Sequence, residues 1–226
     1  MRLSIVIPAL NEERTIRQVL ERVLESPYEK EIIVVDDGST DGTPAILKDF
    51  AGRHAIKALR HETRRGKGAA LRTGFAAATG DIVIVQDADG EYHPEEYPLL
   101  IRPILRGWAD AVYGSRFIGT HRVFLFSHRL GNWLVNAVAN VLYDTMLSDL
   151  ETGFKAIRRE VLQKFPLRSN DFRIEVEITA RLFRGHYRVY EVPISYSGRT
   201  TAEGKKLTWR DGIWALWALL EFRWCS

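Results

Sequence analysis

The sequence predicts an α/β fold with one Rossmann-like, mostly parallel sheet that is flanked by helices. Apolar runs rich in β-branched residues occur at 3–9, 31–37, 81–89 and 110–116. These runs lack the polar alternation of half-exposed strands, which is typical of strands buried on both faces of a parallel sheet. Segments with helical spacing lie between them, and strands that alternate with helices predict a doubly wound arrangement.

The helices of the first half have recognisable starts and ends. Residues 11–25 follow the first strand and carry apolar side chains at helical spacing, with Asn11 as the predicted N-cap. Pro44 stands at a favourable first helical position after the second strand. Residues 67–80 predict a helix that Gly80 closes.

The second half is less regular and predicts more helix than strand. A strand followed by a helix is expected over 151–165, and another strand over 188–196. A long polar loop precedes the last helix. The expected helices are 127–149, 172–185 and 213–224; the first is unusually apolar, the second amphipathic and the third apolar almost all round.

Composition indicates one ordinary globular domain. The 226 residues suffice for a full core, and no repeat or linker-like tract divides them, so we expect a single domain over 1–226. The net charge of +3, without a basic stripe, argues against a nucleic-acid partner. The one cysteine, Cys225, excludes a disulfide framework, and the sequence has no signal peptide and no apolar run of about 18 residues. We therefore expect a cytoplasmic location.

Polar clusters follow three of the predicted strands. They are Pro8 to Glu12, Asp36-Asp37, and Asp87-Ala88-Asp89. Ligands of open parallel sheets bind beyond the carboxyl ends of the strands, so we expect these clusters to meet at one crevice. Two carboxylates at i and i+2 suit Mg²⁺ or Mn²⁺, which take few protein ligands and leave positions for phosphates. The alternative is that Asp-Ala-Asp-Gly is only a turn.

The segment Gly66-Lys67-Gly68 adds a cation at a helix start, a position that suits a phosphate. Lys67 could instead only cap a turn. The spacing is not that of a P-loop, and the sequence has no GxGxxG, HExxH or GxSxG motif and no Cys/His metal spacing. Several common enzyme classes are thereby excluded.

Seven stretches, taken together, resemble the family 2 glycosyltransferases of GT-A fold. They are SIVIPALNEERTI, VVDDGSTDGT, GKGAALRTGF, VQDADGEYHPEEYP, VYGSRF, ETGFKAIRREVL and VPISYSGRTTAEGKKLTWRDG. Within that family the chain looks most like the dolichyl-phosphate mannosyltransferases and other polyprenyl-phosphate glycosyltransferases. The resemblance implies that sugar is transferred, with inversion, from a nucleotide-sugar such as GDP-mannose or UDP-glucose to a polyprenyl phosphate. It also implies a nucleotide-sugar-binding half over 1–116 and an acceptor-binding half over 117–226.

The resemblance assigns donor and metal residues. Asp87, Ala88 and Asp89 form the DXD motif, and Asp89 is the strongest candidate for contact with Mn²⁺ or Mg²⁺. Glu91 stands where the mannosyltransferases often carry Gln, and this position helps to bind the metal. The nucleoside would be held by Pro8, Leu10, Glu12, Val35 and Asp37; the pyrophosphate would be held by Arg199 and Lys205 in a closing loop, with Arg173 nearby.

For the acceptor phosphate, the resemblance points to Arg116 and Arg129. A phosphate monoester is largely dianionic at neutral pH, so no general base is required, which agrees with the lack of an obvious catalytic histidine. Arg116 could instead form a surface ion pair. If the acceptor were a hydroxyl of a polysaccharide or glycolipid, a base would be needed, and Asp149 and Glu151 would be the candidates.

Aromatic residues near the end of the sequence suggest a membrane surface. Trp209, Trp214, Trp217 and Trp224 fall in the last 18 residues, with basic residues beside them. A second apolar surface around Trp133 follows Arg129 directly. We expect peripheral contact with the cytoplasmic face of a membrane; burial in the core, a homodimer contact or a membrane-anchoring partner are the alternatives.

Two further functions stay open at this point. The chain could be a nucleotide-sugar sensor that binds without turnover. A nucleotidyltransferase is disfavoured, because no Gly-rich activation loop lies near the start of the sequence. The sequence leaves open the donor sugar and its base, the polyprenol and the oligomeric state.

Overall fold

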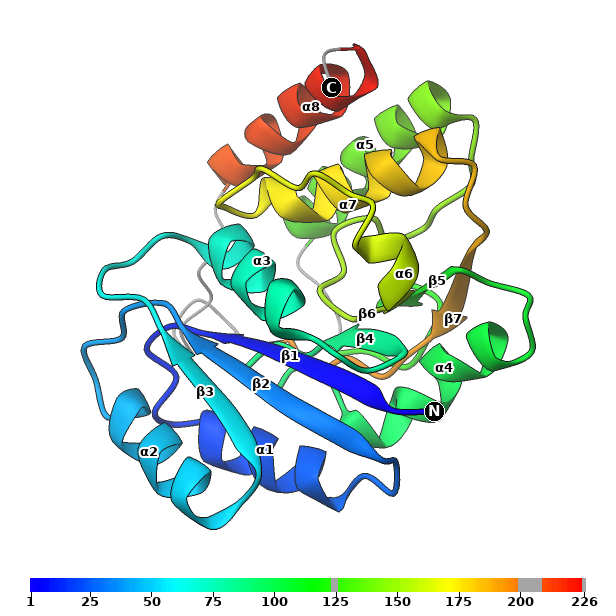
Figure 1. The fold of residues 1–226 in the computed structure, drawn as a ribbon. Coiled ribbons are helices and arrows are strands. Elements are labelled where there is room, and N and C mark those ends of the chain that lie inside the picture. Colours follow the sequence, from blue (N-terminus) through cyan, green and yellow to red (C-terminus); the bar gives the residue numbers. More distant parts are fainter. Residues whose placement is uncertain (123–125, 199–208, 225–226) are drawn as a thin grey trace.

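A central sheet with helices on both faces forms the molecule, as predicted (Figure 1). The computed structural model describes residues 1–122, 126–198 and 209–224. The strands are β1 (Leu3–Ala9), β2 (Lys30–Asp36), β3 (Ile56–Arg60), β4 (Ile82–Val85), β5 (Ala111–Ser115), β6 (Lys155–Arg158) and β7 (Val189–Pro193). The helices are α1 (Ile16–Glu25), α2 (Thr43–Arg53), α3 (Lys67–Ala77), α4 (Tyr97–Leu105), α5 (Phe126–Tyr143), α6 (Arg159–Leu162), α7 (Arg173–Arg184) and α8 (Trp209–Trp224), with a 3₁₀ turn η1 (Pro94–Glu96).

The sheet has the strand order β3-β2-β1-β4-β6-β5-β7. β1 pairs in parallel with β2 and β4, β2 with β3, and β5 with β7. β6 is antiparallel to both of its neighbours, β4 and β5. The prediction of a mostly parallel sheet is thus confirmed. β6 begins at the edge where the parallel strands end, so the residues before it lie at that edge.

The core consists of two apolar layers, one on each face of the sheet. In β1, Ile5 and Ile7 point into the layer formed with α1, α2 and α4, and Val6 points into the layer formed with α3, α5, α6, α7 and α8. Figure 1 shows these two groups of helices on opposite sides of the sheet. Successive side chains of a strand face opposite ways, so a strand that is covered on both faces is apolar at most positions.

Several predicted boundaries were wrong. β3 was not predicted, because it is an edge strand in which one of five residues is fully buried and no apolar run marks it. The helix expected from residue 11 begins at Ile16 with Thr15 as its N-cap; Asn11 has a φ of 51°, and its side chain instead accepts a hydrogen bond from the N–H of Thr40. The helix expected over 127–149 ends at Tyr143, where Asp144 also has a φ of 51°.

Helix α3 lies very close to β1 at one glycine. A Cβ atom on Gly74 would lie 2.3 Å from Cγ1 of Val6, whereas one on Gly52 in α2 would meet nothing within 4 Å. The contact holds α3 against the sheet and so fixes the position of Lys67 at the start of this helix. No helix in the three described ranges is long and apolar enough to cross a bilayer.

We predict opposite effects of the same substitution at these two glycines. Alanine favours a helix over glycine by up to about 1 kcal/mol, so Gly52→Ala should raise the free energy of unfolding. Gly74→Ala should lower it by about 1–3 kcal/mol, because the added methyl group overpacks the contact with Val6. Urea denaturation of both variants measures the difference. Equal stabilisation by the two substitutions would contradict the packing seen here.

Candidate active site

The polar clusters after β1, β2 and β4 meet at one edge of the sheet. Ala9 pairs with Asp36, and the N–H of Asp37 donates to the carbonyl of Ala9 over 2.8 Å. On the other side of β1, the N–H of Gln86 donates to the carbonyl of Val6, which brings the segment after β4 alongside. The three clusters therefore line the carboxyl edge, where open α/β sheets bind ligands.

Asp37 is a fully buried carboxylate that organises a loop. One of its oxygens lies 2.7 Å from Nδ1 of His61 and accepts the N–H of Arg65, and the other accepts the N–H of Gly66 over 2.7 Å. These bonds hold the segment from His61 to Gly66 over the end of β2. In the same region the side chain of Val35 packs in the core, and Pro8 and Leu10 are partly buried.

Glu12 joins the first and third clusters. Its N–H donates to Oγ1 of Thr43, and the hydroxyl of Thr15 lies 3.0 Å from a carboxylate oxygen of Glu12 and 2.8 Å from the carbonyl of Ala88. The structure thus brings Glu12 beside the predicted DXD motif. It does not bring Arg173 there directly: Arg173 is paired with Asp171, its guanidinium lies over Trp214, and these residues line a cavity of about 220 Å³ with Phe172. Arg199 and Lys205 lie outside the described residues.

The DXD motif carries its own counter-cation. Nζ of Lys67 lies 2.9 Å and 3.1 Å from the two carboxylate oxygens of Asp87 and 3.4 Å from Oε1 of Glu175. Burial alone would lower the pKa of Lys67, but the charges of Asp87 and Glu175 outweigh it and raise this pKa above its ordinary value. Gly153 packs against the pair: a Cβ there would lie 2.3 Å from Oδ2 of Asp87. Lys67 is therefore a protonated cation held in place.

The three residues predicted to bind metal have different surroundings. Asp87 and Asp89 are partly exposed, and Oδ1 of Asp89 accepts the N–H of Glu91. Glu91 is buried and accepts the hydroxyl of Tyr196 over 2.5 Å. The described ranges contain no cluster of three or more Asp, Glu, His or Cys side chains that could hold an ion. The donor set does not form a closed cage, but it fits Mg²⁺ or Mn²⁺ that takes one or two carboxylates and completes its shell with phosphate and water.

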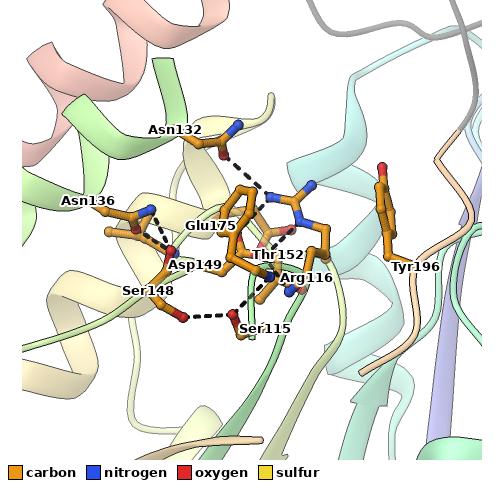
Figure 2. A network of polar contacts seen from close by, with 12 residues as sticks. Ser115, Arg116, Asn132, Asn136, Ser148, Asp149, Thr152, Glu175 and Tyr196 are labelled. Atoms are coloured by element: carbon orange, nitrogen blue, oxygen red, sulfur yellow. Dashed lines mark hydrogen bonds and ion pairs between the residues drawn. The ribbon is translucent and has the colours of Figure 1, made fainter. Parts of the chain in front are cut away.

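Arg116 lies at the centre of a second polar network, directly after β5 (Figure 2). Its Nε and Nη2 donate to the two oxygens of Asp149, each over 2.7 Å, and its N–H also donates to Asp149. Asn132 and the ring of Tyr196 complete its surroundings. Against the opposing effect of burial, the charge of Asp149 raises the pKa of Arg116. Nη1 makes no hydrogen bond with the described residues.

Arg129 is exposed in the first turns of α5 and lies beside the same site. Its guanidinium is 5.1 Å from the centre of the Phe117 ring, and the guanidinium of Arg116 is 5.6 Å from it. One aromatic ring therefore contacts both of the arginines predicted to bind the acceptor phosphate.

The two alternative base residues differ sharply. Asp149 is fully buried and is committed to Arg116. The carboxylate of Glu151 makes no hydrogen bond or ion pair with the described residues, and burial raises its pKa to about 7. A raised pKa of this kind suits a base that works near neutral pH.

Sequence reasoning missed two charged residues next to the DXD motif. Lys155 is fully buried on β6, and Glu175 is buried on α7; Nζ of Lys155 lies 2.5 Å from Oε2 of Glu175. The signal was present, because Lys155 stands in the apolar stretch FKAI and Glu175 stands at an apolar position of an amphipathic helix. His61 was missed as well, as no pattern links it to Asp37.

Comparison with known proteins identifies the family. The model of glycosyl transferase family 2 matches residues 4–165. A dolichol-phosphate mannosyltransferase of Pyrococcus furiosus is 31% identical over 91% of this chain, and the match covers 59% of that protein. The polyprenol monophosphomannose synthase of Mycolicibacterium smegmatis is 31% identical (90% of this chain, 80% of that one), and the undecaprenyl-phosphate mannosyltransferase of Micrococcus luteus is 29% identical (91% and 87%).

Solved structures agree with these sequence matches. Glucosyl-3-phosphoglycerate synthase of Mycobacterium tuberculosis, in complex with Mn²⁺, uridine diphosphate and phosphoglyceric acid, superposes with a TM-score of 0.75. It is 25% identical, and the match covers 99% of this chain and 79% of that one. The expected GT-A fold is thereby confirmed. The sheet and these matches together show that the chain is a glycosyltransferase and belongs to glycosyl transferase family 2.

Proposed function

We propose that this chain transfers a sugar from a nucleotide-sugar to the phosphate of a polyprenol, with inversion and with Mn²⁺ or Mg²⁺. The observation that carries the proposal is the contact made by Tyr196. Its ring lies 5.4 Å from the guanidinium of Arg116, and its hydroxyl donates to Glu91. One side chain thus joins the predicted phosphate-binding arginine to the DXD segment, so an acceptor phosphate and a donor diphosphate would lie within reach of each other.

The reaction needs little from the protein beyond positioning and charge. A phosphate oxygen of the acceptor attacks the anomeric carbon, and the bond from that carbon to the nucleoside diphosphate breaks with its electrons leaving on the diphosphate. Nη1 of Arg116 and the guanidinium of Arg129 would bind and aim the phosphate, which is ionised at neutral pH. Attack on the face opposite the leaving group inverts the configuration.

The donor side would stabilise the leaving group. A divalent ion on Asp89 and Asp87 would neutralise charge that develops on the diphosphate. Lys67 adds a fixed positive charge beside Asp87. We propose that Arg199 and Lys205 close on the diphosphate, that Glu12 and Asp37 shape the nucleoside pocket, and that Glu91 supports the metal. The names of the relatives favour a mannosyl donor, and the solved structure holds uridine diphosphate, so the proposal includes donors of both the GDP-mannose and the UDP-glucose type.

Two apolar helix faces suggest how a lipid acceptor reaches the site. α5 and α8 are joined by hydrogen bonds from Tyr143 to the carbonyl of Leu219 and from Arg223 to that of Leu142. Both expose large apolar side chains, and those of α5 begin directly after Arg129. The exposed side chains are Leu130, Trp133, Leu134 and Val141 on α5 and Ile213, Trp214, Trp217, Leu220 and Trp224 on α8. We propose that this surface rests on the cytoplasmic face of a membrane.

The proposal is tested by transfer of radiolabelled sugar into lipid that organic solvent extracts. GDP-mannose and UDP-glucose are offered separately, with polyprenyl phosphate, with Mn²⁺ and without metal. We expect label in the lipid from one donor and only with metal. Donor binding without label in the lipid, whichever donor is used, would contradict the phosphate acceptor.

In this assay Arg129→Ala should lower transfer about 10- to 100-fold, because a charged hydrogen bond to the phosphate is lost. Arg106→Ala is the matched control. Arg106 also lies over an aromatic ring, 4.8 Å from that of Trp108, but it follows α4 at the opposite edge of the sheet. Donor affinity should not change in either variant. Equal losses in both would remove Arg129 from the acceptor site.

Glu151 favours a second candidate, transfer to a hydroxyl acceptor with Glu151 as base, and its pKa makes a separate prediction. A pKa of about 7 in the folded chain is above the ordinary value near 4.3, so the folded state binds this proton more tightly. Stability is therefore lost as the pH rises from about 4.5 to about 7. Glu151→Gln should match the wild type at pH 4.5 and exceed its free energy of unfolding by at most about 3 kcal/mol at pH 8.

Urea titrations at both pH values measure this difference. A constant difference would show that the pKa of Glu151 is ordinary. In the transfer assay the same variant separates the two functions: the polyprenyl-phosphate reaction should persist in Glu151→Gln, whereas a fall of 10²-fold or more would favour the hydroxyl acceptor.

Vesicle binding tests the apolar surface. Trp217→Ser should reduce co-flotation with vesicles of anionic phospholipid several-fold, since an exposed tryptophan at the interface is lost. Trp108→Ser is the control, because Trp108 is similarly exposed, at 48% against 57%, but lies at the far edge of the sheet. Unchanged flotation of the Trp217 variant would argue that α8 contacts a protein instead, and sedimentation would then identify a dimer.

A further inference from the structure

A line of alternating charges runs from β6 through α7 to the DXD motif. Lys155 contacts Glu175, Glu175 contacts Lys67, and Lys67 contacts Asp87, over 2.5, 3.4 and 2.9 Å. Lys155 and Glu175 are almost completely buried, and the side chains of Lys67 and Asp87 are 15% and 18% exposed. Burying these charges costs free energy, because water no longer solvates them and pairing offsets the cost only in part. A buried line of charges therefore needs a physical reason.

Lys155 and Glu175, the first two members of the line, differ in how well their polar atoms are paired. Lys155 is fully satisfied, because its ammonium donates to the carbonyls of Leu150 and Thr152 and to Oε2 of Glu175. Glu175 is not: Oε1 is buried and accepts no hydrogen bond in the described part of the chain. Lys67 lies 3.4 Å from this oxygen but donates to Asp87 instead. Oε1 of Glu175 can therefore still accept a hydrogen bond, and the nearby ammonium of Lys67 is bonded to Asp87 instead.

The main chain around Lys67 is fixed, so only its side chain can move. A Cβ on Gly66 would lie 2.3 Å from the carbonyl oxygen of Asn170, and one on Gly68 would lie 2.4 Å from that of Ser169. Both glycines are thus packed against the segment before α7. At 3.4 Å the ammonium of Lys67 is close to Oε1 of Glu175 but is not aligned for a hydrogen bond, so a small movement and rotation of this side chain would form one.

A divalent cation at Asp87 would supply the reason for that shift. The ion would bring two positive charges to the carboxylate that Lys67 now contacts, and the two cations would repel each other. We propose that Glu175 is a positioning residue that receives the ammonium of Lys67 through Oε1 when a divalent cation binds at Asp87 and Asp89. This inference rests on the metal-dependent function proposed above. According to this proposal, Lys67 contacts Asp87 in the absence of metal and moves to Glu175 when the metal binds.

The test measures the affinity of the protein for Mn²⁺ alone, from the electron paramagnetic resonance signal of the free ion. Glu175→Gln should weaken Mn²⁺ binding about tenfold, as Lys67 then stays on Asp87. Lys67→Met should strengthen it several-fold, because the competing cation is gone. In the double variant the loss caused by Glu175→Gln should shrink to less than about twofold, since Glu175 acts through Lys67.

A merely structural role for Glu175 gives a different pattern. In that case Glu175→Gln would weaken Mn²⁺ binding equally with Lys67 or Met at position 67, and the inference would be overturned. Weaker binding in Lys67→Met would overturn it as well. Glu177→Gln is the control for loss of a buried carboxylate from α7, because Glu177 accepts the N–H groups of Arg168 and Ser169 and contacts neither lysine. It should leave Mn²⁺ affinity unchanged.

The experiment distinguishes a loss of Mn²⁺ binding from a loss of folding. Glu175→Gln leaves Lys155 without its counter-charge, so each variant is first checked by thermal unfolding. Lys67→Met keeps the pair of Lys155 and Glu175 intact and tests the inference even where Glu175→Gln does not fold. No sugar transfer is measured, so a wrong acceptor does not affect the result. Equal affinities in all variants overturn the inference alone, whereas a wild type that fails to bind Mn²⁺ even with UDP or GDP overturns the metal-dependent function and the inference together.

Discussion

Buried negative charge at the carboxyl edge of the sheet is the constraint on which the rest of the structure depends. Asp37, Asp149 and Glu175 are almost inaccessible to water, and an ionised carboxylate in such surroundings costs several kcal/mol unless it is paired. Asp37 is paired with main-chain N–H groups and His61, Asp149 with Arg116, and Glu175 with Lys155. Since the partners are distant in sequence, the need for pairing decides which loops meet around the crevice.

The reversal of β6 makes this pairing possible. Because β6 is antiparallel to β4, the chain from Asp149 to Gly153 arrives at the edge that Asp87 also occupies. A parallel β6 would place this segment at the opposite edge, and Arg116 would lose its buried partner. The site also needs close approach, which the absence of a side chain at Gly153 permits beside Asp87. Topology, glycine and charge therefore favour the same geometry, which is the consistency expected of a sequence that specifies one structure.

Local patterns predicted the elements that are covered on both faces and the polar clusters that follow them. β1, β2 and β4 were recognisable because double burial demands continuous apolar residues; β3 was not, since an edge strand has no such demand. The resemblance placed Arg116 and the DXD motif, but it could not show that Arg116 is committed to Asp149 with Nη1 left over. Lys155 and Glu175 escaped notice because each is unremarkable until the fold brings β6 and α7 together. Pairing between distant segments is a tertiary property, which no local period encodes.

The distribution of charge also bears on why such a site would need a cation. The proposed donor side carries Asp87, Asp89 and Glu12, whereas the proposed acceptor side carries Arg116 and Arg129. An acceptor phosphate suits the arginines directly. A donor diphosphate does not suit three carboxylates, and Lys67 offsets only one of them while it remains on Asp87. A divalent ion would cancel the two negative charges that remain, and Lys67, moved to Glu175 as proposed, would stay close enough to attract the diphosphate. On this argument the proposed metal dependence would follow from electrostatics as much as from the DXD motif, and the unlike charges of the two sides would keep donor and acceptor from exchanging places.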